Sequence, residues 1–211
     1  MKAPYKKPDY WALKAQKEGY PARSVYKLAE MDEKFGLLTG LRNGGRVLDL
    51  GAAPGSWSLY VLRKCAEYGG AAGVSLTAAD LTPLSCGGRG PGGDNFFFIQ
   101  GDITTAEIRE AILRRGPYRL LLCDAAPATS GNRSLDTLRS LELAETALGY
   151  AETALEEGGS MAVKIFQGGE SPAILARIRE LFSNSRSFKP KACRGSSFET
   201  YYLGIGKKQG R

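Results

Sequence analysis

From residue 46 onward, short apolar runs alternate with longer segments in which apolar residues recur at helical spacing. The apolar runs predict buried strands, over residues 47–50, 73–79, 95–99, 118–123 and 160–166. The segments between them predict helices, over residues 56–68, 104–114, 134–157 and 172–182. The longest helix is expected to close at Gly158-Gly159, because glycine adopts the left-handed conformation that ends helices. Strands that alternate with helices predict a mostly parallel sheet with helices on both faces.

The two ends of the chain depart from this alternation. Residues 1–20 are rich in Lys, Tyr and Pro and indicate an extension laid over a domain or a partner. Apolar residues at helical spacing then predict a first helix outside the sheet, which ends near Gly36. At the other end, residues 185–194 and 198–205 predict two strands with no helix between them. That arrangement favours one antiparallel strand at that edge of the sheet.

Length and composition agree with one α/β domain and an addition. The chain has 211 residues, of which 43% are hydrophobic, so it can bury a full core. We expect a domain with a mostly parallel seven-stranded sheet over residues 37–211. Residues 1–36 form a separate N-terminal segment that comprises the extension and the first helix.

The charge balance points to a polyanionic partner. Lys and Arg number 29 against 22 Asp and Glu, a formal net charge of +7, which fits a protein that binds nucleic acid. The first residues are basic and interrupted by proline with no apolar segment behind them, so we expect no signal peptide. No apolar run approaches the ~20 residues of a membrane helix. The expectation is a cytoplasmic monomer that binds no membrane.

The absence of histidine excludes several classes of enzyme. Ser-His-Asp and Cys-His hydrolases, HExxH metalloproteases and His-ligated metals all require this residue, which the chain lacks. The cysteines are dispersed and form no CxxC pair that would bind zinc, at positions Cys65, Cys86, Cys123 and Cys193. We expect no metal site, and proton transfer must use Lys, Asp, Glu, Tyr or Cys.

The first strand leads into a glycine-containing turn, where ligands of open α/β sheets bind. The turn over residues 51–55 lacks the middle glycine of the GxGxxG fingerprint and has Pro54 in its place, which weakens a pyrophosphate-binding interpretation. A tight turn required by the fold alone is the simpler alternative.

Acidic residues stand at the ends of the first four predicted strands. These are Asp49, Asp80, Asp102 and Asp124. Four carboxylates at one rim repel phosphate but suit a cationic ligand that also carries ribose hydroxyls and an exocyclic amine. S-adenosylmethionine matches that description, with Asp80 at the ribose, Asp102 at the adenine amine and the turn backbone at the methionine end. The full set of expected cofactor-binding residues is Asp49, Gly51, Ala52, Ala53, Pro54, Gly55, Ser56, Trp57, Asp80, Leu81, Asp102, Ile103 and Asp124.

Five motifs in order give the chain a specific resemblance. They are Ser24-Val25-Tyr26-Lys27-Leu28, residues 49–58, Asp124-Ala125-Ala126-Pro127, Val163-Lys164-Ile165-Phe166-Gln167-Gly168 and residues 196–202. From about Tyr10 to Lys207 the sequence resembles the FtsJ-type (large-subunit rRNA methyltransferase E) 2′-O-ribose methyltransferases. The resemblance implies a Rossmann-like class I methyltransferase fold, S-adenosylmethionine as cofactor and a uridine ribose of large-subunit ribosomal RNA as substrate, within the assembled subunit.

The same resemblance implies a catalytic tetrad of Lys27, Asp124, Lys164 and Glu199. The sequence departs from the family at Ser56, where another glycine is common, at Cys123, and in a longer glycine-rich loop over residues 84–93. The loop follows Asp80, so it affects the expected adenosine pocket and leaves the tetrad unchanged.

The chemistry of ribose methylation makes sense of these residue types. Attack by a 2′-hydroxyl in line with a sulfonium methyl group needs its proton removed, and an ordinary lysine, with a pKa of ~10.4, is protonated at neutral pH. Desolvation and a second cation favour the neutral amine, whereas nearby carboxylates oppose it. Lys164 lies inside an apolar run, where a lysine needs a reason, and we expect it to be the proton acceptor. Positioning should matter at least as much as basicity.

Basic and aromatic residues near the N-terminus predict contacts with single-stranded RNA. The expected RNA-binding residues are Lys6, Lys7, Tyr10, Trp11, Lys14, Lys17, Arg23 and Arg194. A solvated helix face with its aromatics in the core is the alternative for the N-terminal residues. Two other functions stay open: the same chemistry on a tRNA or an mRNA cap, and a non-catalytic RNA-binding or ribosome-assembly factor.

Overall fold

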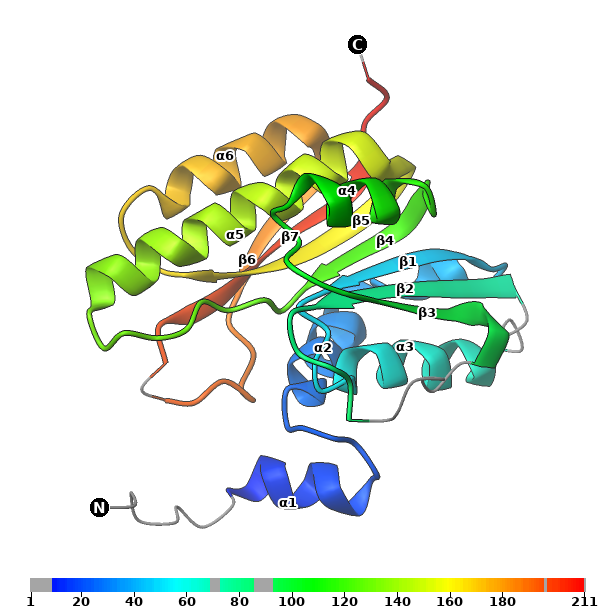
Figure 1. The fold of residues 1–211 in the computed structure, drawn as a ribbon, viewed down its shortest axis with the longest axis horizontal. Coiled ribbons are helices and arrows are strands. Elements are labelled where there is room, and N and C mark those ends of the chain that lie inside the picture. Colours follow the sequence, from blue (N-terminus) through cyan, green and yellow to red (C-terminus); the bar gives the residue numbers. More distant parts are fainter. Residues whose placement is uncertain (1–8, 69–72, 86–92, 196, 211) are drawn as a thin grey trace.

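A computed structural model describes residues 9–68, 73–85, 93–195 and 197–210 (Figure 1). The predicted contacts of Lys6 and Lys7 and the glycine-rich loop over residues 87–92 lie outside these ranges. Within them the chain forms a seven-stranded sheet of order β3-β2-β1-β4-β5-β7-β6. Its strands are β1 Gly45–Leu50, β2 Val74–Asp80, β3 Phe96–Gln100, β4 Tyr118–Cys123, β5 Leu155–Phe166, β6 Phe182–Phe188 and β7 Glu199–Lys207.

The sheet is parallel except at β7, which confirms the expected antiparallel pairing at one end. Strands β3, β2, β1, β4 and β5 pair in parallel, and β7 runs antiparallel to both β5 and β6. The antiparallel strand is second from the edge, and β6 is outermost. Because the connection from β6 to β7 contains no helix, β7 returns beside its predecessor in the opposite direction.

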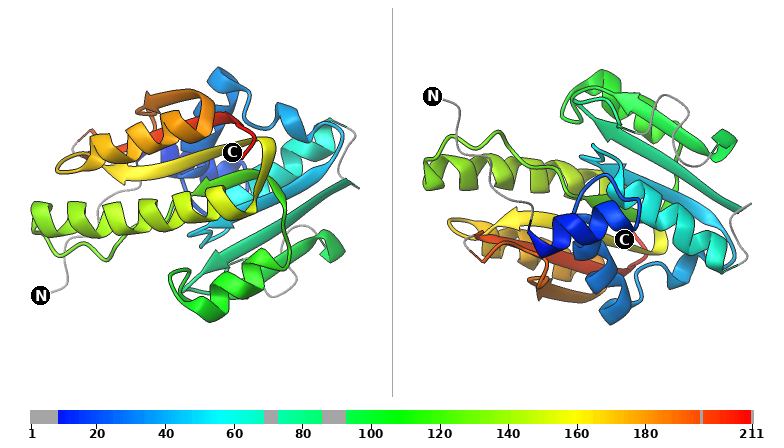
Figure 2. Two further views of the ribbon diagram at one scale, coloured as in Figure 1. Left: turned by 90° about the horizontal axis from the view of Figure 1, so that it is seen from above. Right: turned by 90° about the horizontal axis from the view of Figure 1, so that it is seen from below.

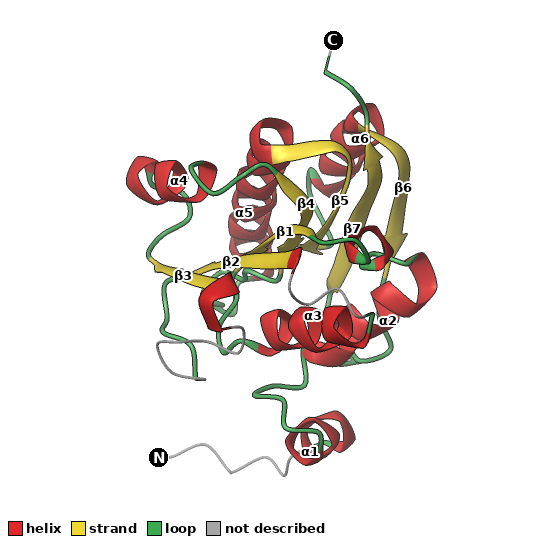
Figure 3. Ribbon diagram, turned by 90° about the vertical axis from the view of Figure 1, so that its right-hand side faces the viewer, coloured by secondary structure: helices red, strands yellow, loops and turns green. Residues whose placement is uncertain are grey.

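Helices cover both faces of the sheet, as expected (Figures 2 and 3). Helices α4, α5 and α6 lie on one face, where Leu148 and Ile178 pack with Leu121 of β4. Helices α2 and α3 lie on the other, where Met31 and Val61 share a core cluster. The helices are α1 Tyr10–Lys17, α2 Val25–Phe35, α3 Ser56–Glu67, α4 Ala106–Leu113, α5 Arg133–Ala154 and α6 Ser171–Leu181. None of the described helices is both long and apolar enough to span a bilayer.

Some element boundaries differ from the sequence-based expectation. The N-terminal extension contains α1, a helix capped by Asp9, whose carboxylate accepts a hydrogen bond from the Ala12 N–H. The long helix ends at Ala154 and not at Gly158, because Leu155 is already extended and pairs with Tyr118. Gly158, with φ of 74°, therefore lies inside β5, where its pairing with β4 is irregular. Strand β6 begins and ends earlier than expected, in register with β7.

Candidate active site

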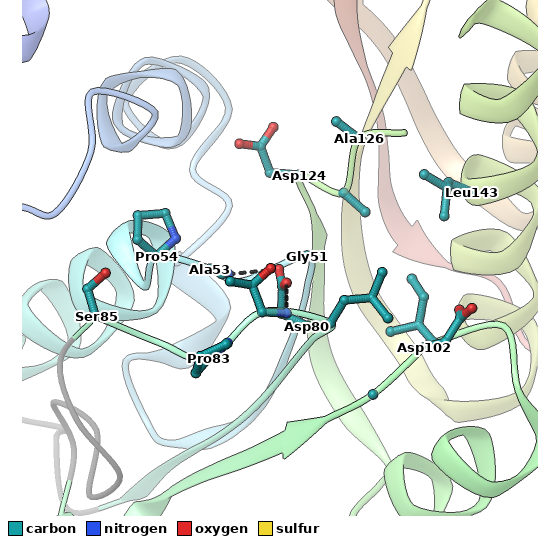
Figure 4. A pocket seen from close by; sticks show the side chains of 15 residues that line it. Gly51, Ala53, Pro54, Asp80, Pro83, Ser85, Asp102, Asp124, Ala126 and Leu143 are labelled. Carbon is teal, nitrogen blue, oxygen red and sulfur yellow. Dashed lines mark hydrogen bonds between the residues drawn. The ribbon is translucent and has the colours of Figure 1, made fainter. Parts of the chain in front are cut away.

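A cavity of about 480 Å³ lies at the carboxyl ends of β1, β2, β3 and β4 (Figure 4). That size is within the usual range for small-molecule and cofactor sites. It is lined by eight of the residues expected to bind the cofactor, namely Gly51, Ala53, Pro54, Asp80, Leu81, Asp102, Ile103 and Asp124. Three of the four carboxylates expected at one rim, those of Asp80, Asp102 and Asp124, line this cavity, and Asp49 does not. Contact of the lining residues with a cofactor stays a prediction.

Gly51 forms the floor of this cavity where β1 turns toward α3. Its φ of 71° is in the left-handed region, and a Cβ atom there would lie 2.4 Å from the backbone of Ala125. Its N–H donates to the Ala79 carbonyl at 2.8 Å, which ties the turn to β2. Only glycine allows the turn after β1 to approach the chain after β4 so closely.

Asp80 and Asp102 both accept hydrogen bonds from backbone N–H groups, and Figure 4 shows those of Asp80. The Asp80 carboxylate accepts from Ala53 N–H at 2.9 Å and from Thr82 N–H at 2.7 Å. Asp102 accepts from the N–H and the hydroxyl of Thr104, and these hydrogen bonds lower the pKa of its carboxyl. Each carboxylate oxygen can accept more than one hydrogen bond, so both side chains keep capacity for a ligand.

Asp49 is fully buried. One of its oxygens accepts a hydrogen bond from the Ser58 hydroxyl at 2.7 Å, and the other, Oδ1, has no partner among the described residues. Burial, together with the charges of Asp124 and Asp80 and against the Ser58 hydrogen bond, raises the pKa of Asp49 to about 7. A buried acceptor without a donor is costly, and a nearby cation would relieve the cost.

The cavity fits S-adenosylmethionine on these observations. Its lining combines three carboxylates with apolar side chains such as Leu81 and Ile103, and β1, which leads into the cavity at Gly51, carries the unpartnered oxygen of Asp49. Acidic groups favour the positive charges of the methionine ammonium and the sulfonium, and apolar walls suit the adenine ring.

Two other residues of the motif contact the segment before α2. Ser56 accepts a hydrogen bond from Ala22 N–H at 2.7 Å, and the Trp57 indole N–H donates to the Ser24 carbonyl at 2.8 Å. The residues of the motif that are not part of the cavity lining are Asp49, Ala52, Gly55, Ser56 and Trp57. Contact of these five residues with the cofactor stays a prediction.

Lys164 is the buried lysine of the site, with 7% of its surface exposed near the end of β5. Its Nζ lies 3.1 Å from Asp124 Oδ1 and donates a hydrogen bond to the Asp124 carbonyl. The hydroxyl of Tyr201 donates to the same Oδ1 at 2.7 Å. Tyr201 is the register partner of Lys164 on β7, so the strand pairing brings both side chains to Asp124.

Lys27 and Glu199 form a second ion pair beside the first. Lys27 Nζ lies 2.9 Å from both carboxylate oxygens of Glu199, and 5.8 Å from the centre of the Tyr201 ring. Burial lowers the pKa of Lys27, but the charges of Asp124 and Glu199 together outweigh burial and raise it. Lys27 therefore carries its positive charge at neutral pH and serves as a fixed cation.

The four tetrad residues come together although they are far apart in sequence. Burial raises the pKa of the Asp124 carboxyl, but Lys164, Lys27 and the Tyr201 hydroxyl outweigh it and lower the pKa overall. Asp124 is therefore an ionised carboxylate that contacts Lys164 and Tyr201 and lines the cofactor cavity. Sequence reasoning did not assign Tyr201 a role. The only signal for it was its place in the last motif, two residues after Glu199.

The predicted RNA-binding residues differ in their exposure to solvent and in their contacts within the protein. Tyr10 is 70% exposed, and Lys17 is exposed as well. Trp11 packs on Tyr26, and Lys14 lies over the rings of both, so this part of α1 is partly used in packing. The other predicted residues of the described chain, Arg23 and Arg194, lie at the start of α2 and in the loop before β7. In the described ranges, no acidic or cysteine cluster could hold a metal ion.

Comparisons with known proteins agree with this architecture. A family model described as FtsJ-like methyltransferase matches residues 20–207. A protein of Treponema denticola named ribosomal RNA large subunit methyltransferase E is 49% identical over 204 residues, 97% of each chain. A protein of the same name from Oleidesulfovibrio alaskensis is 43% identical, over 95% of this chain and 92% of that one. A crystal structure from Plasmodium falciparum, described as a ribosomal RNA methyltransferase, has a TM-score of 0.74 at 26% identity and covers 91% of this chain and all of its own. The chain belongs to the FtsJ-like methyltransferase family.

Proposed function

We propose that this enzyme transfers a methyl group from S-adenosylmethionine to the 2′-hydroxyl of a ribose, in a uridine of large-subunit ribosomal RNA. The observation that carries the proposal is Lys164, a buried lysine held against the Asp124 carboxylate at the edge of the cofactor cavity. A protein that only bound RNA would have no need of a buried lysine at this point. The names of the relatives support the choice of ribosomal RNA.

The cavity residues hold the methyl donor in this proposal. Asp80 accepts hydrogen bonds from the ribose hydroxyls, Asp102 takes the adenine amine, and the turn at Gly51 lies along the methionine part. When bound, S-adenosylmethionine supplies an electrophilic methyl group on a cationic sulfur. The protein contributes orientation and a negative rim, which favours a cationic ligand over a neutral one.

Lys164 accepts the proton from the 2′-hydroxyl in the proposed mechanism. The side chains of Lys164 and Tyr201 both contact Oδ1 of Asp124, and these contacts fix the direction of the Lys164 Nζ. The negative charge of Asp124 favours the ammonium form, whereas the Lys27 cation and a cationic cofactor favour the neutral amine. The 2.9 Å ion pair between Lys27 and Glu199 fixes both side chains on the side of the site where the RNA binds.

The proposal extends to the N-terminal segment and to the state of the protein. Residues 1–36 bind the RNA, with exposed Tyr10 and Lys17 on α1 as contacts, and also supply Lys27 of the tetrad. Residues 37–211 hold the cofactor and the other three tetrad residues. The protein acts as a monomer in the cytoplasm. Its described cysteines are free thiols, as expected in a reducing compartment. Size-exclusion chromatography with light scattering tests the monomer.

Methyl transfer to several RNAs in parallel tests the reaction and the substrate together. Purified large ribosomal subunits lacking the modification, tRNA and capped mRNA are incubated with radiolabelled S-adenosylmethionine, and the products are digested to nucleosides. We expect labelled 2′-O-methyluridine from large subunits alone. Label in tRNA or in the cap would replace the proposed substrate, and label on a base would contradict the proposed atom.

A lack of transfer to all three RNAs needs a separate measurement. If the protein binds S-adenosylmethionine by calorimetry and binds large subunits but transfers no methyl group, the catalytic proposal fails and a binding factor replaces it. Lys64→Ala is the matched control for lysine variants, because Lys64 lies in the last turn of α3 and its one ion pair among the described residues is with Glu67.

A further inference from the structure

A second cavity, of about 370 Å³, adjoins the tetrad on the side of α2 and the loop before β7. Its polar lining consists of Arg23, Ser24, Lys27, Arg194, Ser197 and Glu199. Two of these residues, Lys27 and Glu199, are tetrad members, so the cavity opens directly onto the ion pair. None of its lining residues lines the cofactor cavity.

The charge of this cavity is positive. Three cationic side chains face one carboxylate, and that carboxylate is already paired with Lys27 at 2.9 Å. The two arginines are close enough for the charge of Arg194, together with burial as the larger cause, to lower the pKa of Arg23. Two neighbouring guanidinium groups repel each other, so an anion between them would be stabilised.

The two arginines are held differently. Arg23 is mostly buried, forms an ion pair with Asp9 and donates to the Ala192 carbonyl, so it also attaches the start of α1 to the loop before β7. Arg194 is exposed and has no ion pair among the described residues. Arg23 is therefore a fixed wall of the cavity, and Arg194 is a cation still available to a ligand.

The position of the second cavity relative to the tetrad indicates which anion would bind between the two arginines. Asp124 lines the cofactor cavity, whereas Lys27 and Glu199 line the second cavity, so the tetrad separates the two spaces. In the proposed function the methyl donor binds in the first space, which leaves the second for the acceptor ribose. In RNA the 2′-hydroxyl is next to the 3′-oxygen, which carries a phosphate, so a phosphodiester must lie within a few ångströms of the reacting oxygen.

We propose that Arg194, with Arg23 as its fixed neighbour, binds the phosphodiester on the 3′ side of the methylated nucleotide. This inference rests on the proposed 2′-O-methylation of RNA and adds a specific subsite to it. The acceptor must then be a nucleotide inside an RNA chain, because a 3′-terminal nucleotide has no such phosphate. The hydroxyls of Ser24 and Ser197 are placed to donate further hydrogen bonds to the same group.

The test compares Arg194→Ala with Arg114→Ala, which removes the same charge at the end of α4, before β4 begins, at the opposite edge of the sheet. With large subunits as substrate, Arg194→Ala should raise KM about tenfold and leave kcat within about twofold, since a charge-assisted hydrogen bond to phosphate is lost. Arg194→Lys should recover part of the affinity, and Arg114→Ala should behave as wild type. An unchanged KM, or a lower kcat with the KM of wild type, would overturn the subsite.

A binding measurement that needs no methyl transfer separates this inference from the proposed function. A labelled 12-residue uridine RNA is titrated with each variant over a series of salt concentrations. The logarithm of the binding constant falls as the logarithm of the salt concentration rises. Losing one phosphate contact should make this negative slope less steep by about 0.7 to 1, for Arg194→Ala only. If wild type methylates no RNA but the slope is less steep for Arg194→Ala than for wild type, the proposed function fails and the phosphate site stands.

The side of the ribose is tested with two mononucleotides as competitors of that RNA. Uridine 3′-monophosphate should compete better than uridine 5′-monophosphate against wild type, and Arg194→Ala should remove the difference. Equal competition by the two mononucleotides in wild type would refute the 3′ assignment.

Discussion

The hydroxyl of Tyr201 and the Nζ of Lys164 meet at one oxygen, Asp124 Oδ1, at 2.7 Å and 3.1 Å. The Tyr201 ring also lies 5.8 Å from the Trp57 ring and 5.8 Å from Lys27 Nζ. A fully buried tyrosine thus links the two ion pairs of the tetrad. Its own pKa is raised well above the ordinary value, by burial first and by the charge of Asp124 next, so it stays a neutral donor.

Tyr201→Phe should lower kcat about tenfold and leave the affinity for S-adenosylmethionine unchanged. The ring keeps its packing, but Asp124 loses a donor worth about 1.5–3 kcal/mol to a charged acceptor. The Tyr201 hydrogen bond contributes to the lowered pKa of Asp124, so this pKa should rise in the variant. The carboxylate is lost as pH falls through its pKa, and the acid limb of the kcat profile should therefore move to higher pH. Tyr202→Phe is the control, and an identical pH profile for Tyr201→Phe and wild type would contradict this role.

Asp80→Ala should raise the Kd for S-adenosylmethionine at least tenfold, because it removes the expected acceptor for the ribose hydroxyls. It also removes the acceptor of the Ala53 and Thr82 N–H groups, which shape the rim. Asp80→Asn keeps one acceptor oxygen and should have a smaller effect. Calorimetry measures both, with exposed Asp94→Ala as control. A Kd equal to that of wild type for Asp80→Ala would refute the ribose contact.

Trp57→Phe should weaken the RNA side of the reaction and leave cofactor binding intact. The change removes the N–H that donates to the Ser24 carbonyl at 2.8 Å, at the start of the helix that carries Lys27. We expect a higher KM for large subunits with an unchanged Kd for S-adenosylmethionine. An unchanged KM for large subunits with a higher Kd for S-adenosylmethionine would instead place Trp57 in the cofactor site, as its motif predicts.

The sheet was predictable because its strands are short, apolar and bounded by turns. Strand β4 matches its predicted range over residues 118–123, and β1 and β2 differ from theirs by a residue or two. The boundary between α5 and β5 was not predictable in the same way. Gly158 is a normal helix stop in sequence, but pairing of Leu155 with Tyr118 ends the helix earlier, and that contact joins residues distant in the chain.

The candidate site was predictable in its members more than in their arrangement. The acidic residues at strand ends and the motif residues led to the cavity and to the tetrad. The hydrogen bond from the Trp57 indole to the Ser24 carbonyl depends on how α2 packs against α3, which no local pattern encodes. The same applies to Tyr201, whose contact with Asp124 arises from the antiparallel pairing of β7 with β5.

Asp49→Asn should stabilise the free protein at high pH and have little effect at low pH. Burial raises the pKa of Asp49 from 3.8 to about 7, so the folded protein resists its ionisation. Stability from this group is present below the unfolded pKa and is lost as pH rises toward 7, by at most about 4 kcal/mol. Thermal unfolding at several pH values should show Asp49→Asn and wild type alike near pH 4. The variant should then gain an increasing advantage that levels off above pH 7, and a constant difference at all pH values would contradict this account.

The central claim is that Lys164 takes the proton of the ribose hydroxyl, and single-turnover methyl transfer by Lys164→Ala tests it most directly. The assay uses large subunits and saturating S-adenosylmethionine, with binding of both confirmed separately and Lys64→Ala as control. We predict a loss of the transfer rate of at least a thousandfold with both binding steps preserved, in line with the loss of a general base and its positioning. A rate within tenfold of wild type would contradict the assignment of Lys164 as the proton acceptor.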